Sequence, residues 1–160
     1  DVGVKPVIVG GSAVEFYTRD WYATGDIDLA INKDRRGEIG GIMVDFGFKS
    51  LGRMWVREDL ALYIEAPGSI GDIDLQKAVR VETSDGYAYV VGIEDIVFDR
   101  VQAAQHWKSE GDRDQAVRMA TALYDSIDWA YLERKCGPEG SLKMMESVRK
   151  EAKDGRKENA

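Results

Sequence analysis

Two aspartates separated by one residue, Asp26 and Asp28, lie in the segment Gly25-Asp-Ile-Asp-Leu-Ala-Ile31. In a strand, alternate side chains point to opposite faces, so both carboxylates would share one face and the isoleucines and leucine the other. Two residues of rise separate their Cα atoms by roughly 6–7 Å. Two like charges this close repel each other unless a positive charge lies between them. The pattern therefore indicates a site for a divalent cation.

A glycine pair precedes the aspartates by about fifteen residues, in Val7-Ile-Val-Gly-Gly-Ser-Ala-Val-Glu15. The apolar run predicts a short buried strand, and Gly10-Gly11 predicts a tight turn whose backbone another group can approach closely. Ser12 and Glu15 match a capping box, which predicts that a helix begins at Ser12. The free N–H groups of a helix N-terminus bind anions, so the segment predicts a cradle for a phosphate.

This combination resembles the nucleotidyltransferase superfamily, whose signature is a glycine-rich turn and helix followed by an Asp-x-Asp strand. The match rests on Gly10, Gly11, Ser12, Asp26 and Asp28. The sequence is similar to small stand-alone prokaryotic nucleotidyltransferase-like proteins, including relatives of the toxins of abortive-infection toxin–antitoxin pairs. The resemblance implies an α+β class with the nucleotidyltransferase (polymerase β-like) fold: a mixed β-sheet with flanking helices and a C-terminal helical part.

The resemblance also implies a reaction, the transfer of a nucleotidyl group from a nucleoside triphosphate to a hydroxyl or phosphate acceptor. Asp26 and Asp28 would hold Mg²⁺, with Mn²⁺ as an alternative, because such ions take oxygen ligands and share coordination with phosphates. Gly10, Gly11 and Ser12 would bind phosphates. A third carboxylate, expected from a later strand, would bind the metal or accept the proton of the acceptor.

The sequence leaves the identity of that third carboxylate open. Glu65 is favoured because it ends a predicted strand, Leu60–Glu65, which Pro67-Gly68 terminates. Asp72 and Asp74 compete with it, since Gly71-Asp-Ile-Asp-Leu75 repeats the letters of residues 25–29. The absence of any third ligand is the remaining alternative.

Arg100 is a further candidate for the triphosphate, because related proteins carry basic residues in their helical part. The competing interpretation is an ordinary ion pair with a neighbouring acid such as Asp99. Ion pairs of this kind are common at surfaces and contribute little stability.

Hydrophobic spacing predicts the remaining elements. Residues 35–46 have helical periodicity, residues 48–66 read as two strands, and residues 78–92 read as a strand pair turning at Ser84-Asp-Gly86. Beyond them the pattern becomes helical. We therefore expect a nucleotidyltransferase-like α/β core over 1–92, a helical part packed on it over 93–150, and a frayed charged tail over 151–160.

Composition sets limits on partners and location. The net charge of −7 argues against broad nucleic-acid binding without a local basic patch. The single cysteine, Cys136, excludes an internal disulfide and fits a reducing compartment. No apolar run is long enough for a membrane span and the start has no signal-peptide pattern, so we expect a cytoplasmic protein with no membrane partner. Since the chain starts at Asp1, a preceding helix stays an open question.

Three interpretations remain at this level. The first is an active Mg²⁺-dependent nucleotidyltransferase, toxin-like in acting on RNA or a protein and paired with a cognate antitoxin. The second is a catalytically inactive module of the same fold that binds a nucleotide or a partner protein. The third is a structural α+β domain whose acids are merely solvated. The preferred nucleotide, the acceptor and the oligomeric state are not determined by the sequence.

Overall fold

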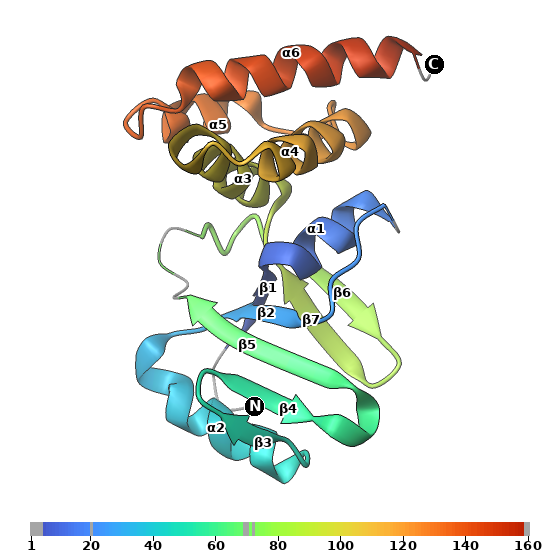
Figure 1. The fold of residues 1–160 in the computed structure, drawn as a ribbon, viewed down its shortest axis with the longest axis vertical. Helices are drawn as coiled ribbons and strands as arrows, with labels where there is room; N and C mark the ends of the chain where they lie inside the picture. The colour runs from blue at the N-terminus through green and yellow to red at the C-terminus, as the bar shows by residue number, and fades with distance from the viewer. Residues whose placement is uncertain (1–4, 20, 69–70, 72, 159–160) are drawn as a thin grey trace. The chain divides into compact units, whose positions relative to one another are not determined.

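The structure of the chain is a computed structural model that describes residues 5–19, 21–68, 71 and 73–158. Within these residues, one seven-stranded sheet has the order β3-β4-β5-β2-β1-β7-β6 (Figure 1). The strands are β1 Val7–Val9, β2 Ile27–Ala30, β3 Lys49–Leu51, β4 Met54–Arg57, β5 Leu62–Gly68, β6 Val79–Thr83 and β7 Gly86–Val90. The helices are α1 Gly10–Thr18, α2 Arg36–Asp45, α3 Ile93–Trp107, α4 Glu110–Ala122, α5 Trp129–Cys136 and α6 Leu142–Glu158. Two 3₁₀ turns, Lys33–Arg35 and Glu58–Leu60, complete the described elements.

The sheet is mixed. β2 is parallel to β5 and β1 is parallel to β7, whereas the remaining neighbours are antiparallel. The hairpin predicted over 78–92 is present as β6 and β7, and the helix predicted over 35–46 is present as α2. The α+β class with a mixed sheet and additional helices is thus confirmed. β3 is a short edge strand that the sequence pattern did not separate from the predicted pair.

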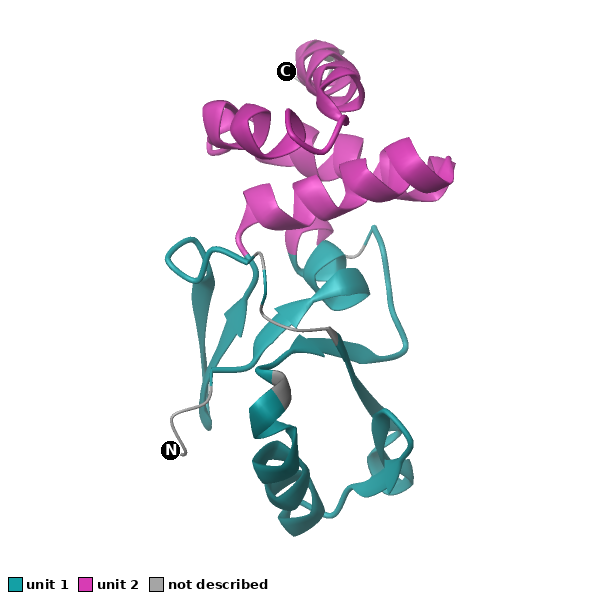
Figure 2. Ribbon diagram, turned by 90° about the vertical axis from the view of Figure 1, so that its left-hand side faces the viewer, with its two compact units in different colours: residues 1–16, 20–91 teal, residues 17–19, 92–160 magenta. Residues whose placement is uncertain are grey.

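Contacts divide the chain into two compact units (Figure 2). The first unit comprises residues 1–16 and 20–91, and the second comprises residues 17–19 and 92–160. The first unit contains the whole sheet with α2.

One face of the sheet in the first unit is covered by α2. Its apolar side chains Leu29, Ile31, Trp55, Ile64 and Ala66 pack with Ile39, Met43 and Phe48. Since alternate side chains of a strand point to opposite faces, the neighbours of these residues must point away from α2. Asp28 and Glu65 are such neighbours, so burial of one face of β2 and β5 directs their carboxylates to the other.

The second unit is a helical cluster in which α4 packs against both α3 and α6. Its buried side chains include Val97, Val101, Met119, Leu132, Met145 and Val148. None of the described helices is long and apolar enough to cross a bilayer.

The predicted frayed tail over 151–160 is wrong for residues 151–158, because α6 continues as far as Glu158. Ala152 is fully buried, and Arg156 makes a paired contact with Asp125 at 2.6 and 2.8 Å. The segment has few apolar residues, which is why the sequence predicted a frayed tail. In the structure, one buried alanine and the ion pair of Arg156 hold the last turns of α6 against the rest of the second unit. Residues 159 and 160 lie outside the described part of the chain.

Candidate active site

The glycine turn, Gly10-Gly11, joins β1 directly to α1. Gly10 has a left-handed backbone with φ +56°. A Cβ atom at this position would lie 2.3 Å from Oδ2 of Asp28, far inside van der Waals contact. Position 10 therefore requires glycine for two reasons, its backbone angle and the approach of the Asp28 carboxylate.

Asp28 is held against this turn by a backbone donor. Its neighbour across the antiparallel β1–β2 pair is Val9, the residue before the turn. The N–H of Gly11 donates to Oδ2 of Asp28 at 3.2 Å. The carboxylate thus lies where the first amide groups of α1 converge, which is the position expected for a negative group at a helix N-terminus.

Asp26 is fixed by two hydroxyl groups. The hydroxyl of Thr24 donates to Oδ1 of Asp26 at 2.7 Å, and the hydroxyl of Ser12 donates to its main-chain carbonyl at 2.8 Å. The Glu15 carboxylate accepts the N–H of Thr24 at 3.1 Å. The predicted capping box is therefore wrong: Ser12 and Glu15 tie α1 to the approach of β2, and the helix begins at Gly10.

Glu65 reaches the same place from the neighbouring strand. The parallel β2–β5 pair aligns Asp28 with Glu65, so their side chains stand side by side on one face. One oxygen of Glu65 is 3.4 Å from Nη2 of Arg53 in the β3–β4 turn. The Arg53 side chain is 76% exposed and that of Glu65 22% exposed, so this ion pair is on the solvent side of the carboxylate.

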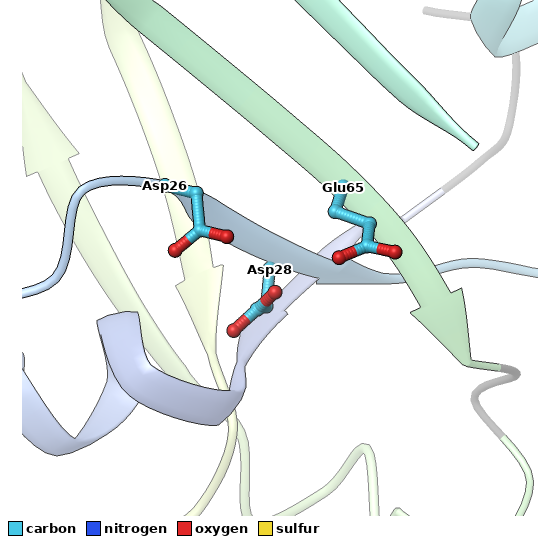
Figure 3. Close-up of side chains that lie close together, drawn as sticks. All are labelled: Asp26, Asp28 and Glu65. Carbon is cyan, nitrogen blue, oxygen red and sulfur yellow. The ribbon is translucent and has the colours of Figure 1, made fainter. Parts of the chain in front are cut away.

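Asp26, Asp28 and Glu65 form a carboxylate cluster (Figure 3). Each offers an oxygen atom, and these atoms all lie within 4.8 Å of one another. Two oxygens on opposite sides of one Mg²⁺ are about 4.2 Å apart, because each bond is about 2.1 Å. All three groups are half-buried hard oxygen donors, so the cluster fits a hard divalent cation with little movement.

The sequence matches no family model and no curated protein. Solved structures with the same fold include the following two. One is the crystal structure of ANT(2″)-Ia in complex with adenylyl-2″-tobramycin, with a TM-score of 0.53, 16% identity, and coverage of 92% of this chain and 88% of that one. The other is an antigenic nucleotidyltransferase-like protein from Paracoccidioides brasiliensis, with a TM-score of 0.55, 17% identity, and coverage of 89% and 86%. This chain has the nucleotidyltransferase fold.

The structure describes two of the three candidates for the third carboxylate, Glu65 and Asp74, and places them differently. Glu65 belongs to the cluster with Asp26 and Asp28. Asp74 is not part of the carboxylate cluster found among the described residues. Its carboxylate accepts the N–H of Gln76 at 3.0 Å and closes a local turn. Asp72 lies outside the described residues.

Arg100 belongs to the second unit of the nucleotidyltransferase fold. Its guanidinium is 2.6 Å from Oδ1 of Asp112 and 3.5 Å from Oδ2 of Asp99. The Arg100 side chain is mostly buried. Within the second unit it makes ion pairs with neighbouring acids, as the competing interpretation expected. The cluster residues, the glycine turn and Ser12 all belong to the first unit.

A cavity of about 640 Å³ also lies in the first unit. Ser12, Thr24, Asp26 and Tyr63 line it together with apolar residues such as Ile8 and Val90. The register of the sheet places Ile8 beside Leu29 and Val90 beside Ile8, so Ile8 and Val90 lie on the face that packs against α2. The cavity is therefore lined by side chains from both faces of the sheet, and it is not confined to the face of the Asp28 and Glu65 carboxylates.

Sequence reasoning missed the groups that hold the carboxylates in place. Thr24 was visible as a hydroxyl two residues before Asp26, a spacing at which side chains often pair locally. Arg53 gives no local signal of its contact with Glu65, because that contact depends on the turn between β3 and β4, which the sequence pattern did not predict.

Proposed function

We propose that this protein is a nucleotidyltransferase that moves a nucleotidyl group from a nucleoside triphosphate to a hydroxyl acceptor, with Mg²⁺ as the metal. The observation that carries the proposal is the carboxylate cluster beside the N-terminus of α1: oxygen ligands for a cation lie next to donors for a phosphate. The fold of ANT(2″)-Ia, which is seen with adenylyl-2″-tobramycin, supports the same class of reaction.

In this proposal Asp26, Asp28 and Glu65 hold the metal, and the glycine turn with the first amides of α1 binds the phosphates. A bound Mg²⁺ supplies polarisation of the phosphorus and offsets the charge of the leaving pyrophosphate. Ser12 and Thr24 orient Asp26 through the hydrogen bonds described above. Arg100 has no assigned role in this scheme, because Asp99 and Asp112 already pair with it.

The acceptor could be a small molecule, RNA or a protein. Adenylyl-2″-tobramycin in the fold neighbour favours a small molecule as the first acceptor to try. Action as a toxin, a cognate antitoxin and a cytoplasmic location stay predictions from the resemblance and from composition.

The test is Mg²⁺-dependent release of pyrophosphate from each of the four nucleoside triphosphates, with and without acceptors. We expect Asp26→Asn, Asp28→Asn and Glu65→Gln each to lower the rate about 10³-fold, because metal assistance supplies several kcal/mol. Asp74→Asn is the matched control, since it also removes a carboxylate charge but outside the cluster, and it should keep the rate. Equal rates in the cluster variants and the wild type would contradict the proposal.

The alternative is a module that binds nucleotide or a partner without turnover. Its distinguishing result is calorimetric binding of a nucleoside triphosphate with Mg²⁺ and no pyrophosphate with any acceptor. Two contacts favour this alternative: Gly11 donates to Asp28, and Arg53 pairs with Glu65. Both occupy carboxylate oxygens of the cluster that a catalytic metal would need.

A further inference from the structure

The face of the sheet that carries the carboxylate cluster continues beyond Glu65 as an apolar surface. The registers align Glu65 with Met54 on β4, and Met54 with Leu51 on β3. Directly opposed residues of antiparallel strands point to the same face with their Cβ atoms about 5 Å apart. Glu65, Met54 and Leu51 therefore form one row that runs from the cluster to the edge of the sheet.

Tyr63 occupies the next row on this face. It lies two residues before Glu65 on β5, so both side chains point the same way. The parallel register, carried one residue back from the Ile27–Ile64 pair, places Tyr63 beside Asp26. Three corners of this four-residue square are carboxylates, and the fourth is an aromatic ring.

These side chains are exposed where strand residues of a closed core would be buried. Leu51 is 68% exposed and Tyr63 is 39% exposed, while Met54 is half-buried. An exposed apolar patch that borders a polar cluster is typical of a ligand surface. We call Tyr63, Met54 and Leu51 together the apolar row; Tyr63 comes from the row beside that of Met54 and Leu51.

Positive charge borders this surface. Lys49 lies on the same face, aligned with Val56, and Arg53 reaches the outer side of Glu65. Neither β3 nor β4 contains an acidic residue. A ligand over the apolar row therefore meets an aromatic ring, aliphatic side chains, basic groups and, at one end, the Glu65 carboxylate, which fits an uncharged molecule with a planar ring.

The proposed reaction determines which substrate lies there, so this step rests on the proposed function. The attacking and leaving oxygens of a phosphoryl-type transfer lie roughly in line, on opposite sides of the phosphorus. The glycine turn lies on the β1 side of Asp28 and Glu65 lies on the β5 side. If pyrophosphate leaves over the glycine turn, the attacking hydroxyl comes from the side of Glu65 and the apolar row.

We propose that the apolar row is the acceptor subsite, and that it takes a hydroxyl compound with an aromatic ring that stacks on Tyr63. The acceptor oxygen forms a bond to the α-phosphorus, and the bond from that phosphorus to the bridging oxygen of the β-phosphate breaks. Pyrophosphate departs with that electron pair, and the hydroxyl proton passes to the Glu65 carboxylate oxygen that does not hold the metal. Tyr63 sets the specificity of the acceptor through its ring and takes no part in bond making.

The probes are phenyl β-D-glucoside and methyl β-D-glucoside, which offer the same hydroxyls and differ only in the group on the anomeric oxygen, an aromatic ring or a methyl group. Saturation-transfer NMR with the full chain, Mg²⁺ and a nucleoside triphosphate should show contact to the phenyl protons. The phenyl compound should bind about tenfold more tightly than the methyl compound, in line with one stacked ring. Equal binding of the two glucosides would overturn the proposal.

Substitutions locate the contact. Tyr63→Leu should abolish the tenfold preference, and Tyr63→Phe should retain it because the ring remains. Tyr87→Leu is the matched control: Tyr87 is also an exposed strand tyrosine, 53% exposed, but it lies on β7 beyond β1. Loss of the preference in Tyr87→Leu, or its survival in Tyr63→Leu, would place the ring elsewhere and overturn the proposal.

The same samples separate this inference from the proposed function. Ring contact that depends on Tyr63, together with pyrophosphate release that only the phenyl compound accelerates, is the expected result. Ring contact that depends on Tyr63 without any pyrophosphate release supports the subsite while it contradicts the proposed function. Pyrophosphate release that both glucosides accelerate equally supports the proposed function and overturns the subsite.

Discussion

Gly10 links the two halves of the candidate site at the scale of a single residue. Its φ of +56° lets β1 turn directly into α1, and its missing Cβ leaves room for the Asp28 carboxylate. An alanine here would both strain the backbone and push Asp28 out of place. Gly140 also has a left-handed backbone, but an added Cβ atom there would meet no other atom. An alanine at position 140 would therefore strain the backbone without a steric clash, which separates the two effects.

We expect Gly10→Ala to lose divalent-cation binding by at least tenfold, because a Cβ 2.3 Å from Oδ2 of Asp28 must displace that ligand. Gly140→Ala is the control: Gly140 has φ +68°, and an added Cβ there would meet no atom within 4 Å. Both variants should lose about 1–2 kcal/mol of unfolding free energy from the left-handed backbone. Calorimetry with Mn²⁺ and thermal unfolding measure the two effects, and wild-type Mn²⁺ affinity in Gly10→Ala would contradict the prediction.

Arg53 is a positive charge at the outer edge of the cluster. Since a cation that enters the cluster must share Glu65 with this guanidinium, Arg53→Ala should raise the affinity for Mn²⁺ about two- to fivefold. The gain is small because Arg53 is 76% exposed and such pairs are weak. Added salt should shrink the difference.

The measurement for Arg53 is Mn²⁺ titration at two ionic strengths. Arg80→Ala serves as the control, because Arg80 pairs with Glu82 on β6, away from the cluster. A lower Mn²⁺ affinity in Arg53→Ala would mean that the arginine organises Glu65 rather than competing with the ion.

At the scale of elements, α2 covers the apolar face of β2 and β5 despite three glycines in ten residues. Gly37 and Gly41 have nothing within 4 Å of an added Cβ. Glycine loses more conformational entropy in a helix than alanine does. The helix therefore depends on packing, through Ile39 and Met43, more than on its own propensity.

Gly37→Ala and Gly41→Ala should each stabilise the first unit by about 0.5–1 kcal/mol. Gly47→Ala should destabilise it by about 1 kcal/mol instead, because Gly47 follows α2 with φ +83°. Urea unfolding of the three variants checks both signs. A loss of stability in Gly37→Ala and Gly41→Ala would show that α2 needs glycine for a reason other than backbone freedom.

The sequence predicted the elements that depend on local patterns. Asp26 and Asp28 could be assigned to one face because strand alternation needs no partner strand. Ser12 and Glu15 were misassigned because the same letters satisfy a capping box or, as here, a contact with Thr24 and Asp26 fourteen or fewer residues away. Glu65 was chosen through the resemblance, since the register that sets it beside Asp28 is a tertiary property.

At the scale of the whole molecule, the cluster and the helical part belong to different units. The cluster, the glycine turn and the apolar row come from residues 10–65, within the sheet unit. Each unit has its own buried side chains, Val7, Ile31 and Trp55 in the first and Val101, Met119 and Met145 in the second. A ligand of the cluster should therefore stabilise the first unit directly.

We expect saturating Mg²⁺ to slow amide hydrogen exchange in peptides that cover β1, β2 and β5. Binding at 100 times the dissociation constant stabilises the native state by about 2.7 kcal/mol, which corresponds to about 100-fold slower exchange through unfolding of that unit. Peptides from α4 and α6 should keep their rates. Mass spectrometry resolves these regions, with Asp28→Asn as the control that should show no protection anywhere.

The bond between Gly11 and Asp28 has a consequence for the order in which ligands arrive. In the protein without ligands, the Gly11 N–H that would bind a phosphate already donates to the Asp28 carboxylate. The negative charge of that carboxylate also repels a phosphate. A divalent ion bound by Asp28 offsets the negative charge of this carboxylate and attracts the phosphate. It also weakens the hydrogen bond from the Gly11 N–H to Asp28, so that this N–H can donate to the phosphate. Anion and cation should thus each strengthen the other's hold by the same factor, as reciprocity between linked sites demands. A nucleoside triphosphate without a divalent metal ion should therefore bind this site only weakly.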